Sequence, residues 1–165
     1  MNYWILQTNP NVFVLEHECL YKEGQEDWWG ISRYYNEIEF GDIAYIWKAR
    51  DYRRFNDIKP RGIYAKATIL LEPRRISQFQ GKLDYLKQRE AKYWSNLEQK
   101  TNHESKRAVI IKYCEPTNKL GLNALTENKL FSAGLGNIGP FKFTNAEIYK
   151  LDEEHAYKIE GLIKN

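Results

Sequence analysis

The residues best suited to chemistry lie in two short segments rich in aromatic and polar side chains. Residues 28–36 read WWGISRYYN, and residues 47–50 bring one aromatic ring and two cations to the end of an expected strand. Adjacent tryptophans in a strand point to opposite sides, so one of the first pair must leave the common core direction. Unpaired bases are recognised by stacking on such rings and by hydrogen bonds to their edges. Tryptophans also anchor ordinary cores, and composition alone weighs the two interpretations equally.

Basic residues cluster just after the second segment. The net charge is +3 and the pI about 8.7, values compatible with a phosphate partner but too small to demand one. The cations that could contact phosphates are Lys48, Arg50, Arg53, Arg54, Lys59 and Arg61. The alternative is a solvated surface loop over residues 51–61.

The glycines of residues 134–139, GLGNIG, match the sequence of the dinucleotide-binding motif but not the structural context that it needs. That pattern needs a strand before it and a helix after it, early in a βαβ unit. Here it comes late in the chain, and Pro140 follows the third glycine. We expect a loop in which glycines permit positive φ angles, either near a ligand or simply at the surface.

Catalytic and metal-binding patterns are weak. The histidines, His17, His103 and His155, are scattered, and the two cysteines show no zinc-ligand spacing. We therefore expect no cofactor and no metal. The first residues lack a basic segment followed by an apolar run, and no stretch has the length of a membrane span, which predicts a cytoplasmic protein that binds no membrane.

Hydrophobic patterning supplies the elements that position these residues. Strands are expected at residues 3–8, 43–49, 62–71, 106–114 and 147–151. Helices are expected at residues 12–22 and 82–100, and a last one begins after Asp152 as its N-cap. Strands and helices do not alternate regularly, which favours an α+β barrel-like fold of about five to six strands. The length predicts a single domain over residues 1–165.

In order and spacing, four segments resemble the EVE domain, a member of the PUA-like superfamily that includes the YTH and ASCH domains. They are NYWI at residues 2–5, WGISRY at 29–34, GDIAYIWK at 41–48 and GIYA at 62–65, with Gly136, Asn137 and the last helix fitting the same pattern. The resemblance implies a PUA-like mixed β-barrel with surrounding helices. The long segment at residues 82–100 has no clear counterpart in the family pattern.

The resemblance also implies a pocket for a modified base, either methylated or hydroxymethylated cytosine, or methylated adenine. By position, Trp29 and Trp47 would be the stacking walls. Hydrogen bonds to the base would come from Ser32, Tyr34 and Asn137. Phosphates would be contacted by Arg33, Lys48 and Arg50.

Three functions follow as hypotheses. The first is a non-enzymatic reader of a modified base in DNA or RNA. The second is an ASCH-like enzyme that processes a nucleotide or RNA, with Lys48, Glu37 and Tyr45 as candidate groups. The third is an interaction domain that uses the helix expected at residues 82–100. The sequence leaves the choice of base, DNA or RNA, and the oligomeric state open.

Overall fold

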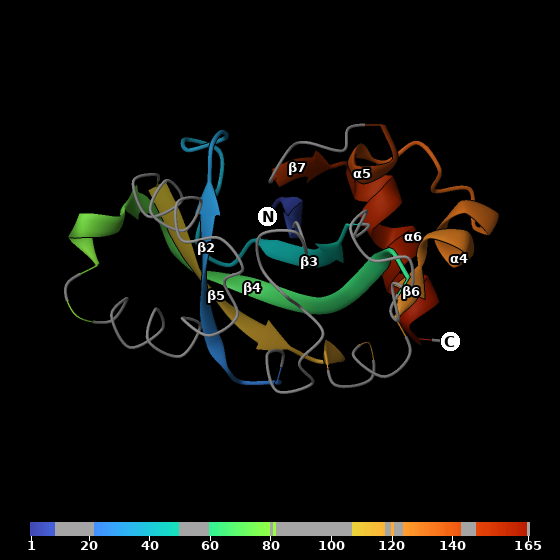
Figure 1. Cartoon of the computed structure of the whole chain (residues 1–165), viewed down its shortest axis with the longest axis horizontal. Coiled ribbons are helices and arrows are strands. Elements are labelled where there is room, and N and C mark those ends of the chain that lie inside the picture. The colour runs from blue at the N-terminus through green and yellow to red at the C-terminus, as the bar shows by residue number, and fades with distance from the viewer. Residues whose placement is uncertain are drawn as a thin grey trace.

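The computed structural model describes residues 1–8, 22–49, 60–79, 81, 107–117, 120, 124–142 and 148–164. Its strands are β1 (Tyr3–Thr8), β2 (Glu26–Ile31), β3 (Ile43–Lys48), β4 (Gly62–Arg75), β5 (Arg107–Cys114), β6 (Leu125–Thr126) and β7 (Ile148–Leu151). Its helical segments are η1 (Ile76–Gln78), α4 (Glu127–Ser132), α5 (Gly139–Lys142) and α6 (Glu153–Lys164). The helices α4, α5 and α6 gather at one end of the molecule, and η1 lies at the other (Figure 1).

The strands form one mixed sheet in the order β2-β5-β4-β3-β1-β7, and β6 pairs with the beginning of β4. The pair β1 and β3 is parallel, whereas the other pairs are antiparallel. The expected α+β fold with a mixed sheet is thus confirmed. Among the described residues no ladder joins the end strands β2 and β7, so the sheet is not a closed barrel.

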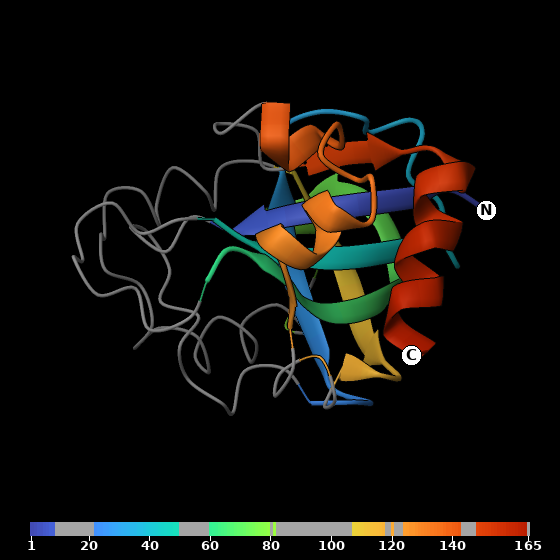
Figure 2. The ribbon, with the colours of Figure 1, turned by 90° about the vertical axis from the view of Figure 1, so that its right-hand side faces the viewer.

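The two faces of the sheet carry separate cores because neighbouring strand residues point to opposite sides. One, here called the helix-side core, joins Tyr3, Ile5, Tyr45 and Trp47 to buried residues of α4 and α6. Figure 2 shows α6 running past the beginnings of strands β1 and β3. The other, the inner core, includes Trp4, Leu6, Ile31, Ala44, Ile46, Val109 and Ile111.

Strand β2 was not among the expected strands, and its residues 28–31 form a regular strand. Its partner is β5, in which Val109 pairs with Trp29. Trp28 packs in a small cluster with Phe79 and Ile110, and Trp29 packs on the inner core. The expected divergence of the two tryptophans is confirmed. Pairing with a strand some 80 positions away cannot be read from local periodicity, which explains the missed strand.

Strand β4 continues past residue 71, where we expected it to end, and includes Pro73. The register between β4 and β5 shifts between Leu71 and Arg74, so the proline lies at an irregularity of the ladder. Proline is tolerated at such positions because no regular ladder hydrogen bond is lost there.

The other expected strands and the last helix are confirmed within a few residues. Asp152 begins α6 as expected: its Oδ1 accepts a hydrogen bond from the His155 amide at 2.8 Å. The helices expected at residues 12–22 and 82–100 fall almost entirely outside the described residues. None of the helices that the structure describes has the length and apolar character needed to cross a bilayer.

Candidate functional site

Buried polar side chains gather where the parallel strands β1 and β3 end. Thr8 is aligned with Lys48 and Gln7 with Trp47. Thr8 is 5% exposed and Lys48 is 1% exposed. Parallel strands finish at the same edge of a sheet, the usual place for a ligand in open parallel sheets. Burial of a polar group is costly unless it is satisfied by a hydrogen bond, so the Thr8 hydroxyl marks this edge as the first candidate for a binding site.

Alternation along the strands divides these residues between the two faces. Thr8 and Lys48 share the parity of Leu6 and Ile46 and therefore point to the inner side. Among the described residues, Thr8 Oγ1 is buried without a hydrogen-bond partner. A buried hydroxyl of this kind can donate to or accept from a ligand.

The two tryptophans expected to sandwich a base belong to different faces. Trp47 is fully buried in the helix-side core, where its ring meets Phe141 edge-on at 5.5 Å and the Arg61 guanidinium lies 5.9 Å from it. Trp29 is half-buried against the inner core. The two rings therefore do not form opposite walls of one cavity. Of the two tryptophans, Trp29 keeps surface on which a base could stack.

The segment after β2 joins the two edges of the sheet. Arg33 donates from Nε and Nη2 to the carbonyl oxygen of Ile148 in β7, at 3.0 and 2.6 Å. Its guanidinium lies 5.2 Å from the Tyr34 ring and 5.5 Å from the Tyr149 ring. Arg33 is thus engaged by the protein, although its side chain stays exposed.

Tyr34 has an unusual backbone for a bulky residue, with φ at 62°. Its ring lies 5.4 Å from that of Trp4, whose Nε1 donates to Asp42 at 2.8 Å. Left-handed φ at a non-glycine residue costs energy and recurs at functional sites. Ser32, beside it, is exposed.

The glycine-rich loop approaches the same edge from the helix side. Asn137 is exposed, while the next residue, Ile138, is buried in the helix-side core with Trp47. A Cβ on Gly139 would lie 2.2 Å from Cδ1 of Tyr149, so this glycine serves close packing. The Tyr149 hydroxyl in turn donates to Gln7 Oε1 at 3.5 Å. Arg50, the last of the expected phosphate contacts, lies outside the described residues.

Sequence reasoning missed Gln7, Thr8 and Tyr149. The run Thr8-Asn9-Pro10 was interpreted only as the end of a strand. A polar residue at the last position of an otherwise apolar strand is the signal that would have found Thr8. Tyr149 carries no such signal, because its neighbours come from β1 and the glycine loop.

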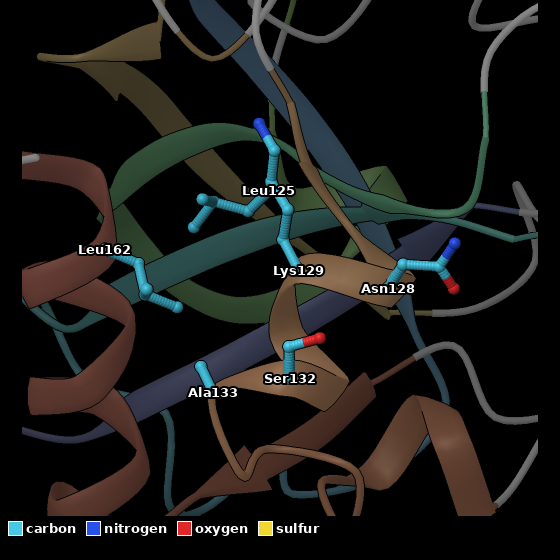
Figure 3. A pocket seen from close by; sticks show the side chains of 6 residues that line it. All are labelled: Leu125, Asn128, Lys129, Ser132, Ala133 and Leu162. Carbon is cyan, nitrogen blue, oxygen red and sulfur yellow. The ribbon is translucent and has the colours of Figure 1, made fainter.

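A groove lies between α4 and α6, away from the buried polar edge. This groove has a volume of about 530 Å³ and is lined by Leu125, Asn128, Lys129, Ser132, Ala133 and Leu162 (Figure 3). None of these side chains is aromatic, so the groove offers no ring for stacking on a base. Among the described residues, no group of acidic, histidine or cysteine side chains is placed to hold a metal ion.

Several solved structures share the fold of this chain. No curated protein matches the chain. The structure is similar to a hypothetical protein from Leishmania major, with TM-score 0.60, 15% identity and coverage of 99% of this chain and 95% of the other. It is also similar to a Pseudomonas putida protein, with TM-score 0.58, 18% identity and coverage of 97% and 98%.

A third solved structure was determined with nucleic acid. It is human THYN1 in complex with DNA containing 5-methylcytosine, with TM-score 0.54, 15% identity and coverage of 100% of this chain and 99% of the other. At these identities the structural likeness concerns the fold. The EVE domain model matches residues 2–144, most of the sequence, so the chain belongs to the EVE domain family.

Proposed function

We propose that this protein is a reader that binds a modified base of a nucleic acid on the inner side of its sheet. The observation that carries the proposal is the buried polar edge formed by Thr8 and Lys48, on the same face as half-buried Trp29. The family match supports a nucleic-acid partner, as does the fold shared with THYN1, which was solved with methylcytosine DNA.

In this proposal the roles of the expected residues are redistributed. Trp29 stacks on the base, and Thr8, Lys48 and Ser32 contact its polar edge. Lys48 suits the base better than a phosphate, because it is only 1% exposed. Trp47 supports the site from the helix-side core, and Tyr34 holds the inner surface through its contact with Trp4.

The expected preference for a methylated base is modest. Burial of one additional methyl group contributes about 0.8 kcal/mol, or roughly a fourfold change in affinity. A larger preference requires a hydrogen bond that only the modified base can make or avoid.

Titration with short oligonucleotides tests the reader function. DNA and RNA strands with one 5-methylcytosine are compared with unmodified strands at low salt. Binding of either is expected, with the modified strand preferred, and no binding to any of them would refute the proposal.

The substitution Trp29→Ala tests the stacking role. We expect an affinity loss equivalent to about 1–3 kcal/mol, because base–aromatic stacking contributes that much. Phe131→Ala is the matched control, since Phe131 is an aromatic side chain that is 67% exposed on α4. Thermal unfolding verifies that both variants are folded, and equal affinities of the two would contradict the assignment.

No observation favours the alternative of an ASCH-like enzyme. The three groups considered for catalysis are held apart by different partners. Tyr45 donates to Glu160 at 2.6 Å, and Glu37 pairs with Lys150 at 2.6 Å. Lys48 is the last residue of β3, and its side chain points to the opposite face of the sheet from that of Tyr45.

A further inference from the structure

The end of β2, the beginning of β5 and the end of β4 pair with one another, and arginines lie at this place in the sheet. Ile31 is aligned with Arg107, and Arg107 with Arg75. Arg74 precedes Arg75, and Arg33 follows Ile31 by two positions. Arg61 is the one arginine of the described part of the chain that lies elsewhere.

The pairing of Arg75 with Arg107 is unfavourable by itself. Like charges directly opposite each other on antiparallel strands destabilise a sheet. In the described residues neither arginine has a carboxylate partner, in contrast to Arg61, which meets Glu127 at 3.1 Å. Arg107 is held over the Tyr35 ring at 4.9 Å. The arrangement keeps two cations together without a resident anion among these residues.

The direction of the side chains links this pair to the proposed reader surface. Arg107 has the parity of Val109 and Ile111, which belong to the inner core, and Arg75 is its direct partner. Both therefore point to the side on which Trp29 lies. Arg74 is aligned with Ala108, which belongs to the cluster around Trp28, and points the other way.

We propose that Arg75 and Arg107 form a phosphate site for the strand whose base stacks on Trp29. Guanidinium groups bind phosphate oxygens in a bidentate manner, and an anion between them removes the repulsion within the pair. Arg33, two positions after Ile31, is instead committed to Ile148 of β7. The inference rests on the proposed function in one respect only, namely that the phosphate belongs to a nucleic acid.

Arg75→Gln and Arg74→Gln form a matched test, since they are adjacent, both exposed and change the net charge equally. We expect Arg75→Gln to weaken the binding of methylated and unmethylated strands alike, by about tenfold at low salt. The slope of log affinity against log salt should fall by about one. Arg74→Gln should retain most of the affinity and the slope. Equal effects of the two variants would overturn the site in favour of a general charge effect.

Arg75→Glu tests whether a loss of binding could instead come from a loss of structure. It places opposite charges on the paired positions, so the fold should melt at the same or a higher temperature than the wild type. Binding should nevertheless fall further than for Arg75→Gln. Wild-type affinity in this variant would refute the proposal.

Melting temperatures measured with inorganic phosphate distinguish a failure of this anion site from a failure of the reader function. Phosphate should raise the melting temperature of the wild type and of Arg74→Gln more than that of Arg75→Gln. If no oligonucleotide binds but this difference is present, the reader function fails and the anion site stands. If oligonucleotides bind but neither phosphate nor salt dependence distinguishes the two variants, the anion site fails and the reader function stands.

Discussion

At the scale of single residues, some aromatic side chains are wholly buried in the core, whereas others keep solvent-exposed surface. Trp47 and Trp29 look alike in sequence, since both stand beside polar neighbours in aromatic segments. In the structure Trp47 has no exposed surface, and Trp29 remains half-buried. The polar group that sequence reasoning passed over, Thr8, lies buried on the side of Trp29.

Thr8→Val tests whether the buried hydroxyl serves binding or stability. In the described residues Thr8 Oγ1 has no hydrogen-bond partner, and such a group costs about 1–3 kcal/mol when buried. We expect the free energy of unfolding, measured in urea, to stay the same or rise by about 1 kcal/mol. Affinity for the methylated oligonucleotide should fall. A clear loss of stability with unchanged affinity would assign the hydroxyl to the fold.

At the scale of elements, α6 is tied to the sheet by a small polar cluster at the edge of the helix-side core. Glu160 of α6 accepts a hydrogen bond from the buried Tyr45 hydroxyl and pairs with Lys66 of β4 at 2.7 Å. Apolar residues of the same helix, Ala156, Ile159 and Ile163, provide the packing. The helix therefore has both an apolar face and a fixed polar anchor.

Tyr45→Phe should destabilise the fold by about 2 kcal/mol near neutral pH, because a hydrogen bond to a charged group is lost. Burial, followed by the bond to Glu160, raises the pKa of Tyr45. The folded protein thus keeps this proton above about pH 10, where the unfolded chain loses it. Stability should therefore fall as the pH rises past this value.

The variant isolates the contribution of Tyr45, since the pKa of Tyr3 is also raised, chiefly by burial. Denaturant unfolding between pH 7 and 11 should show a shallower decline for Tyr45→Phe than for the wild type. Parallel curves would mean that Tyr45 does not titrate differently in the folded and unfolded states.

At the scale of the whole molecule, side chains of the segment after β2, among them Arg33 and Glu37, reach β7 at the opposite end of the open sheet. No ladder connects β2 and β7 in the described residues, yet Arg33 after β2 donates twice to Ile148 of β7. A guanidinium group suits this bridge because its fixed fork offers several donors at once.

Arg33→Ala should therefore lower the free energy of unfolding by about 1–2 kcal/mol and speed amide exchange in β7. Arg33→Lys should recover only part of the loss, since an ammonium group lacks the planar fork. Arg74→Ala, at an exposed arginine outside this bridge, should change stability by less than about 0.5 kcal/mol. Equal stabilities of the Arg33 and Arg74 variants would show that the bridge contributes nothing.

Much of the fold could be predicted because it is encoded in local patterns. Strands β1, β3, β5 and β7 show apolar runs between turn residues, and α6 has an N-cap, acidic residues in its first turn and an apolar face. Strand β2 could not be found in this way, because its segment contains two tryptophans and a glycine and is stabilised by distant β5. Of the residues proposed for the site, the sequence pointed to Trp29 and Lys48 but not to Thr8, whose burial beside Lys48 depends on the parallel pairing of β1 with β3.

By itself, the sequence determined the family, the α+β class, most strand positions and the presence of an aromatic and polar surface. The tertiary structure was needed to show that Trp47 is buried while Trp29 keeps exposed surface. The physical reason is that alternation sets adjacent residues on opposite faces, but not which face a helix will cover. The helices α4 and α6 pack over Trp47, the inner side keeps Trp29 with Thr8 and Lys48, and arginines distant in sequence meet through strand register.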